Sequence, residues 1–396
     1  MSPSPRSPFD APARFLVTAP AGLSGLLRDE LAELGCEAVL TPAGVAVVEG
    51  GWDVAARILI RSRIGSRLLL SVREFSARTS EMLYNQVRRV DWRSLFPPTM
   101  SIAINGYGTA DGTDYKLSFA PLKIKDAVCD EFRKLGGPRP DVDRMNPDVR
   151  MAAFFFNGRC ELSIDLCGRP MHRRGYRAEG AAAPIRENRA AALLRFAGYD
   201  GAAPLIDPFC GSGTIPIEAA WIARRMAPGL ARPVESWAGA RLIPALAEAL
   251  EAERGAAMAE VLPEAAHPIV GRDIDATTLA TARSNARLAG VDGNIRFESG
   301  DARDLAATGG WIVANPPYGE RLAEGDGDAA ALISDFVRRV KHHGTGATLG
   351  LVLPRGEMAA AVGLKPKRKL PLESGPLGLS FLIFEIYAGS RRPARA

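Results

Sequence analysis

Cysteine is scarce in this sequence, with five residues in 396, and no two of them form a Cys-x-x-Cys pair. An odd number of cysteines without paired spacing argues against a disulfide framework and against a zinc site, and it is typical of a protein of the reducing cytoplasm. The four histidines show no ligand spacing, so we expect no bound metal. No apolar run reaches about 18 residues, so the sequence predicts no membrane-spanning helix.

Excess charge is also small, since the formal net charge is only +5. Basic residues nevertheless cluster within 57–67, 169–177 and 365–369. Such clusters fit contacts to a phosphate backbone, and they fit solvated surface faces equally well. Residues 1–13 are rich in proline and serine and lack an apolar segment, so we expect a disordered leader there and no signal peptide.

The first half of the chain alternates short strands and helices. Residues 14–19 have the pattern of a strand, and 22–34 carry leucines at helical spacing. Residues 154–168 form a predicted β-hairpin with Asn157 and Gly158 at its turn. This half therefore predicts an α+β domain over 14–168.

A basic connector, 169–185, leads into a second half with a different spacing of predicted strands and helices. There, strands and helices alternate at the spacing of a doubly wound parallel sheet, which predicts an α/β domain over 186–390. An alanine-rich stretch, 240–260, predicts one additional helix. The predicted strands are 204–207, 268–273, 294–300, 311–316, 347–354 and 379–389.

The strongest local motif is LIDPFCGSGTIPIEAA, residues 205–220. An apolar strand ends at Asp207, and a loop with Gly211 and Gly213 then enters an apolar helix, as in dinucleotide-binding folds. The P-loop lysine is missing and the GxGxxG spacing fails, so a nucleotide phosphate is not favoured. Asp207 instead offers a carboxylate to a cationic aminoacyl group, unless the glycines form only a plain turn.

Further acids follow the next two predicted strands. Asp273 ends the second strand, where a carboxylate accepts hydrogen bonds from both hydroxyls of a ribose. Asp301 follows the third strand, within reach of an adenine amino group. Asp275 is predicted to cap the helix 276–289. Any one acid alone fits a helix cap, whereas their common position favours a shared ligand.

The fourth predicted strand runs into Asn315-Pro316-Pro317-Tyr318. The amino nitrogen of a nucleobase is a poor nucleophile because its lone pair is delocalised into the ring. Hydrogen bonds to the Asn315 side-chain oxygen and the Pro316 carbonyl would make it tetrahedral and nucleophilic, and the prolines would fix that carbonyl. Tyr318 offers a face on which a flipped base can stack. The alternative is that two prolines merely end a strand.

The motifs DPFCGSG and NPPY together resemble those of class I methyltransferases that act on amino groups of nucleobases. Residues 124–151 and 161–177, with SRIGSRLLL and IEAAWIARRMAPGL, resemble the N-terminal half of the bacterial large-subunit rRNA guanine-N2 methyltransferases, in the UPF0020 methylase family. The likeness spans about 14–389. It implies a Rossmann-like domain with a seven-stranded mixed sheet, preceded by a ferredoxin-like and THUMP region, with S-adenosylmethionine as cofactor and 23S rRNA or its precursor as partner.

The resemblance also assigns roles to individual residues. Cofactor contacts fall on Asp207, Phe209, Gly211 and Gly213 for the methionine part, and on Asp273, Ile274, Asp301 and Ala302 for the adenosine part. Asn315, Pro316 and Tyr318 are expected to bind the target base, and the expected RNA contacts are Arg173, Arg174, Tyr176 and Arg177.

Three alternatives remain open from the sequence. The first alternative is a guanine of tRNA, which related THUMP enzymes methylate. Some members of the family carry a second methyltransferase domain whereas this sequence shows one, which leaves the exact nucleotide open. A DNA amino-methylase shares NPPY, but no target-recognition domain is evident. A non-catalytic RNA-binding assembly factor would not need the intact motifs. Cys210 is interpreted as a packing residue and not as a methyl carrier.

Overall fold

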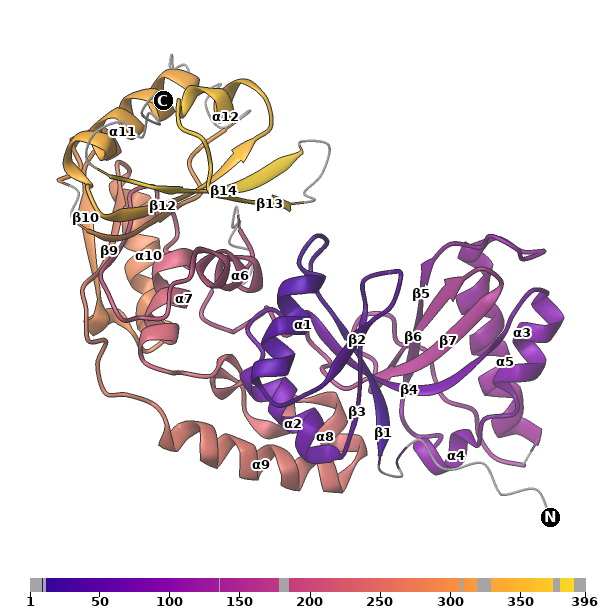
Figure 1. Cartoon of the computed structure of the whole chain (residues 1–396). Helices are drawn as coiled ribbons and strands as arrows, with labels where there is room; N and C mark the ends of the chain where they lie inside the picture. Colours follow the sequence, from indigo (N-terminus) through magenta and orange to yellow (C-terminus); the bar gives the residue numbers. More distant parts are fainter. Residues whose placement is uncertain are drawn as a thin grey trace. The chain divides into compact units, whose positions relative to one another are not determined.

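A computed structural model of the chain describes residue 9 and residues 12–134, 136–177, 185–306, 309–318, 329–372 and 378–387. Most of the predicted leader therefore lies outside the described residues. The chain divides into two compact units (Figure 1). The first comprises 1–19, 28–171 and 232–256, and the second comprises 20–27, 172–231 and 257–396.

The first unit is built on a seven-stranded sheet with the order β2-β3-β1-β4-β7-β6-β5. All neighbouring strands are antiparallel except β5 and β6, which run parallel. The strands are β1 (Ala13–Thr18), β2 (Ala38–Leu40), β3 (Ala46–Gly50), β4 (Arg67–Ser76), β5 (Ile102–Gly108), β6 (Val149–Phe156) and β7 (Arg159–Asp165).

The turn between β6 and β7 is the predicted hairpin. Asn157 and Gly158 both have positive φ, 48° and 70°, which is the backbone of a two-residue type I′ turn. The register pairs Phe156 with Arg159 directly across the turn. The Asn-Gly signal was therefore sufficient to predict this connection.

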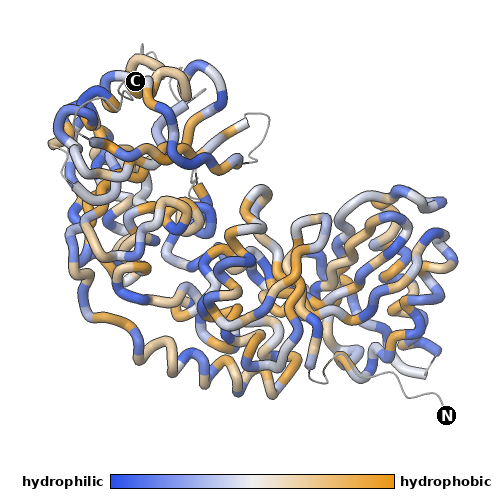
Figure 2. Tube along the Cα trace, viewed as in Figure 1, coloured by the Kyte–Doolittle hydropathy of each residue, from blue (hydrophilic) through white to orange (hydrophobic). Residues whose placement is uncertain are grey.

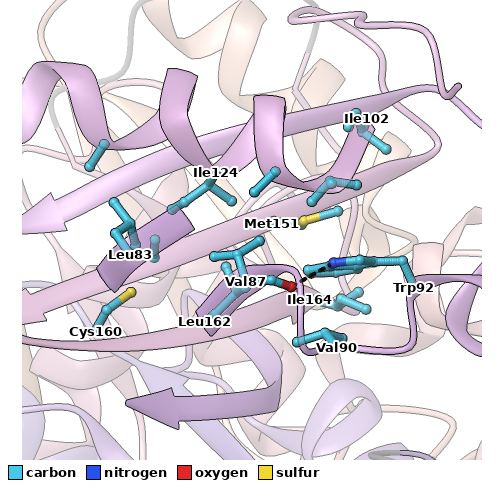
Figure 3. Close-up of a cluster of buried hydrophobic side chains, with 14 of the residues drawn as sticks. Leu83, Val87, Val90, Trp92, Ile102, Ile124, Met151, Cys160, Leu162 and Ile164 are labelled. Atoms are coloured by element: carbon cyan, nitrogen blue, oxygen red, sulfur yellow. Dashed lines mark hydrogen bonds between the residues drawn. The ribbon is translucent and has the colours of Figure 1, made fainter. Parts of the chain in front are cut away.

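The helices between residues 80 and 134 cover the apolar side of the sheet part formed by β4, β7, β6 and β5. Figure 3 shows Leu83 and Val87 packed with Leu162 and Ile164, while the Trp92 indole donates to the Val87 carbonyl over 2.9 Å. In Figure 2 the most hydrophobic part of this unit follows its central strands. The helices are α2 (Trp52–Arg61), α3 (Ser80–Val87), α4 (Trp92–Leu95) and α5 (Ala120–Lys134), with α1 (Ser24–Glu33) divided between the units.

Residues 232–256 belong to the second half of the sequence but pack in the first unit. Arg232 is buried and its guanidinium donates to the Cys167 carbonyl over 2.9 Å, while Gly239 N–H donates to the Leu166 carbonyl over 2.9 Å. The single helix predicted over 240–260 is wrong in detail. It is two helices, α8 (Ala238–Leu242) and α9 (Pro244–Ala259), because Ile243 precedes a proline and adopts an extended backbone.

The second unit contains the predicted doubly wound sheet, with the order β10-β9-β8-β11-β12-β14-β13. The first five of these strands are parallel, and β14 runs antiparallel to both of its neighbours. The sheet is thus seven-stranded and mixed, as expected. The strands are β8 (Leu205–Asp207), β9 (Ile269–Asp273), β10 (Ile295–Ser299), β11 (Gly310–Ala314), β12 (Ala347–Pro354), β13 (Arg368–Leu372) and β14 (Leu379–Glu385).

Helices flank this second sheet. On one side, Ile333 and Phe336 join a buried cluster with Leu349 and Leu351 of β12. The helices are α6 (Glu187–Ala197), α7 (Thr214–Ala223), α10 (Ala276–Leu288), α11 (Ala329–His343) and α12 (Glu357–Ala361).

Candidate cofactor and target-base site

The predicted site residues follow four neighbouring parallel strands of the second unit. Parallel strands present their carboxyl ends at the same edge, so the loops after β10, β9, β8 and β11 are adjacent. The chain order reverses between β8 and β11, which is where ligands bind in open α/β sheets. The structure therefore places Asp301, Asp273, Asp207 and Asn315 along one edge of the sheet.

The loop after β8 needs both of its glycines. Gly213 has φ 84° and begins α7, and a Cβ there would lie 3.1 Å from the Ala282 Cβ and 3.3 Å from the Phe297 ring. Gly211 has φ 52°, yet nothing lies within 4 Å of the place where its Cβ would be. Gly213 is thus required for close packing, whereas Gly211 leaves its backbone open to a ligand.

Asp207 is the buried carboxyl of the predicted site, and among the described residues it has no positively charged group that influences its pKa. Its side chain is buried, with 1% of the residue exposed. Burial raises the pKa of its carboxyl well above the ordinary value, a hydrogen bond from Phe209 N–H at 3.1 Å opposes this, and nearby Asp273 raises the pKa further. A bound cation would favour the ionised carboxylate, so this residue suits a positively charged ligand. Phe209 itself packs its ring edge-on against Phe336.

Asp273 is held in place by the backbone around it. One carboxylate oxygen accepts from Gly211 N–H at 2.9 Å, and the other accepts from Asp275 N–H at 3.0 Å. The following residue, Ile274, is 72% exposed and offers apolar surface beside the carboxylate. Asp275 accepts from Thr277 N–H at 2.8 Å, so its predicted role as the cap of α10 is confirmed.

Asp301 is engaged by a partner that sequence reasoning missed. Arg303 donates to both of its carboxylate oxygens, through Nε at 3.0 Å and Nη2 at 2.6 Å. This hydrogen bonding lowers the pKa of Asp301, against a smaller opposing effect of burial. Asp301 also caps the short 3-10 helix Ala302–Asp304, in which Ala302 is buried. A ligand amino group would share this carboxylate with Arg303.

The NPPY segment directly follows β11. Pro316 is buried, and Asn315 and Tyr318 are partly exposed. The indole of Trp311 donates to the Ala197 carbonyl over 3.2 Å, which ties β11 to the end of α6. Near the start of α6, burial and the positive charge of Arg186 lower the pKa of Arg189, and Tyr318 opposes them. Arg186 and Arg189 were not identified from the sequence, because nothing local relates them to Tyr318.

Two of the RNA contacts predicted in the basic connector are buried in the second unit. Arg174 and Tyr176 are each 1% exposed, and both contact Glu218 of α7. The Tyr176 hydroxyl lies 3.2 Å from the Glu218 Oε1, and the Arg174 Nε lies 3.6 Å from the same atom. Both side chains are thus packed beside the buried carboxylate of Glu218, which does not support the RNA contact predicted for them.

Arg177 also points inward, with 14% of its side chain exposed, so the RNA contact predicted for it is not supported either. Its guanidinium donates to Thr214 at the start of α7. Arg173 is exposed and is the member of the predicted set that can meet RNA.

Other candidate chemistry is limited. Cys210 is buried, and burial raises the pKa of its thiol, which fits a packing role. Within the described part of the chain, no cluster of three or more His, Cys, Asp or Glu residues could hold a metal ion. Among the same residues, no helix combines the length and apolar character needed to cross a membrane.

Three family profiles match successive parts of the chain. The RlmL ferredoxin-like domain matches residues 14–69, and the THUMP domain matches residues 77–165. The UPF0020 profile, described as an RMKL-like methyltransferase domain, matches residues 174–382. This last match begins inside the connector, which agrees with the packing of Arg174 against α7.

Individual relatives match along nearly the whole chain. The ribosomal RNA large subunit methyltransferase K/L of Syntrophotalea carbinolica is 38% identical over 388 residues, covering 96% of this chain and 54% of the relative. The chain spans about half the length of the curated relatives it matches.

Two solved structures match along nearly their whole length. A methylase structure from Clostridium difficile 630 is 27% identical with a TM-score of 0.84, covering 96% of this chain and 100% of that one. SMU.472, described as a methyltransferase complexed with SAH, is 25% identical with a TM-score of 0.83, covering 96% and 99%.

Proposed function

Because this chain belongs to the RMKL-like (UPF0020) methyltransferase family, we propose that it transfers a methyl group from S-adenosylmethionine to the exocyclic N2 amine of a guanine in structured RNA. The observation that carries the proposal is the arrangement at one sheet edge. Two carboxylates, Asp207 and Asp273, and an Asn-Pro-Pro-Tyr segment follow strands that are neighbours in the sheet. A cationic methyl donor and a planar amine acceptor would thus meet at one place.

The cofactor half of the site consists of the three acids and the glycine loop. S-adenosylmethionine, when bound, supplies a methyl group on a positively charged sulfur. Asp207 would face the cationic methionine end, since its buried carboxylate has an adverse environment without a cation. Asp273 would accept hydrogen bonds from the ribose hydroxyls, and Asp301 would accept one from the adenine amino group. Phe209, Gly211, Gly213, Ile274 and Ala302 would line the remaining surface of the ligand.

The acceptor half consists of Asn315, Pro316 and Tyr318. The asparagine side-chain oxygen and the Pro316 carbonyl would accept hydrogen bonds from the two N–H groups of the target amine and so hold its lone pair toward the donor. Pro317 fixes the backbone at this point. Tyr318 would stack on the base, which must leave its helix to enter the site. Alignment of donor and acceptor then supplies most of the rate acceleration.

The RNA is assigned from the first unit and from the relatives. The ferredoxin-like and THUMP regions precede the catalytic unit, and the longer relatives are named ribosomal RNA large subunit methyltransferases. We therefore place 23S rRNA or its precursor first as substrate, in the cytoplasm, with tRNA as the alternative. Exposed Arg173 is our candidate for a contact to the RNA backbone.

The deciding experiment is mass-spectrometric mapping of methylated nucleosides in rRNA, tRNA and DNA from a strain that lacks the gene. We expect one N2-methylguanosine to disappear from 23S rRNA and to return with the wild-type gene but not with an Asn315→Ala copy. Loss of a tRNA N2-methylguanosine would move the substrate to tRNA, and loss of a methylated DNA base would favour a DNA amino-methylase. If no methylated nucleoside changes and calorimetry detects no binding of S-adenosylmethionine, the chain is a non-catalytic assembly factor.

A further inference from the structure

We propose that Arg177 is a positioning residue that holds the cofactor loop and the target-base segment in mutual register. The inference rests on the proposed methyl transfer and extends it to a residue that contacts neither reactant. It starts from the geometry of one guanidinium group in the connector, which forms an ion pair with Glu187 inside the second unit.

The Arg177 guanidinium reaches three partners. Its Nη2 donates to the Thr214 hydroxyl at 2.6 Å and to the Ile185 carbonyl at 3.0 Å. Its Nε lies 3.3 Å from a carboxylate oxygen of Glu187, and the side chains of Arg177 and Glu187 are 14% and 7% exposed. A single partly buried cation thus joins two segments that are separate in sequence.

Both segments lead into the proposed site. Thr214 is the first residue of α7 and directly follows Gly213, so its bond to Arg177 fixes the exit of the cofactor loop. Glu187 is the first residue of α6, and Ile185 precedes it by two positions. Arg177 therefore anchors the beginnings of both helices at one point.

Helix α6 continues this link to the acceptor side. Tyr318 of the target-base segment is among the groups that influence the pKa of Arg189, in the first turn of this helix, so the two side chains lie near each other. At its other end, the Ala197 carbonyl accepts from the indole of Trp311 in β11, the strand that leads to Asn315. A shift of α6 relative to α7 would therefore move the acceptor relative to the donor, and a misplacement of about 1 Å can cost on the order of 100-fold in rate.

Arginine suits this position better than lysine. Its planar group offers five donors in fixed directions and stays charged when buried, whereas an ammonium is a compact point charge on a flexible stem. Removing Arg177 alone would also leave the buried carboxylate of Glu187 without its cation, which is strongly destabilising. A useful variant must therefore change both residues.

The test compares Arg177→Lys with the double variant Arg177→Met/Glu187→Gln, which removes both charges and nearly keeps their volume. We expect single-turnover methyl transfer to fall about 10–100-fold in the double variant, and less in Arg177→Lys, while RNA affinity stays unchanged. Thr214→Val should slow the wild-type protein but add nothing in the double variant, because both changes break the same link.

The matched control is Arg232→Met, which removes a buried arginine of the first unit and should lower the melting temperature without changing the rate per folded molecule. Arg177 is merely structural if its variants melt earlier and yet transfer methyl groups at the wild-type rate. If Thr214→Val slows transfer equally in both backgrounds, Arg177 does not act through Thr214. A wild-type protein that is inactive on both rRNA and tRNA would refute the proposed function instead, so the two failures are distinguishable.

Discussion

The two units each contain a seven-stranded sheet, but the strands run differently in them. In the second unit, five consecutive parallel strands place their loops at one edge, so acids distant in sequence become neighbours. In the first unit, most neighbours are antiparallel and successive loops lie at opposite edges. The parallel sheet is therefore suited to build a single pocket, whereas the antiparallel one is suited to present a surface. Four substitutions test this contrast.

The largest effect is expected for Asn315→Ala, at the acceptor side of the proposed site. The variant loses the side-chain oxygen that would hold the target amine, and transfer should fall on the order of 10²–10³-fold, as when one preorganised hydrogen-bonding group is removed. Cofactor affinity should be nearly intact, because Asn315 is proposed to contact the target amine and not the cofactor. Rapid-quench kinetics and calorimetry measure the two quantities, and unchanged turnover would contradict the assignment.

Asp207 should make cofactor binding depend on pH. Burial raises the pKa of its carboxyl in the unliganded protein, so at low pH the group is protonated and must lose its proton before it can pair with a cation. Affinity for S-adenosylmethionine should therefore fall as pH falls below that pKa, by up to about tenfold per pH unit. Asp207→Asn should bind more weakly and lose this dependence; calorimetry over a pH series would reveal an unaltered slope.

The same group has an opposite effect on folding. A carboxyl whose pKa is raised in the folded state contributes to the stability of the folded protein at low pH. This contribution is lost as pH rises from 3.8, the pKa of the carboxyl in the unfolded chain, through its pKa in the folded state. Unliganded Asp207→Asn should thus melt no lower than the wild type at neutral pH. A lower melting temperature would mean that the carboxylate stabilises the loop in a way that its burial does not suggest.

In the first unit, Gly158→Val should reduce stability without affecting the pocket. Gly158 has φ 70°, and a Cβ there would lie 3.1 Å from the Gly112 carbonyl oxygen. We expect a loss of about 1–2 kcal/mol in the free energy of unfolding, measured by denaturant titration. Affinity for S-adenosylhomocysteine should not change, and a change there would show that the pocket depends on the hairpin.

The smallest effect is expected for Arg173→Ala. If the exposed arginine contacts one phosphate, RNA binding should weaken modestly and the slope of log K against log salt should fall by about 0.7–0.9. Cofactor affinity should stay the same, in contrast to Asp207→Asn. Binding measured across several salt concentrations provides the slope, and an unaltered slope would place the RNA path elsewhere.

The sequence predicted those parts of the fold that depend on local signals. The glycine loop, the Asn157-Gly158 turn and the Asp275 cap each lie within a few residues of what they determine. Strand β13 was missed because its sequence, RKLPL, contains two cations and a proline and lacks a clear alternation. As an edge strand it needs little apolar character, so its pattern is weak.

The site contacts that the sequence did not indicate have a common cause. Arg174 and Tyr176 look like RNA contacts because their neighbours are basic, but their partner Glu218 lies more than forty positions away. Tyr318, which influences the pKa of Arg189, is also remote from it in sequence. Such pairings are fixed by packing, so composition alone suggests an exposed cation where the fold buries one.

Residues 232–256 pack in the first unit, although the residues before and after them belong to the second. The methyltransferase half therefore cannot be excised as one uninterrupted piece of chain. A fragment starting near residue 172 would carry Trp237, Leu246 and Leu250, which are buried in the full chain, without the strands and loop they pack against. Such a fragment would expose apolar surface and tend to aggregate. Replacing residues 232–256 with a short glycine-rich linker is the rational way to study the methyltransferase half in isolation.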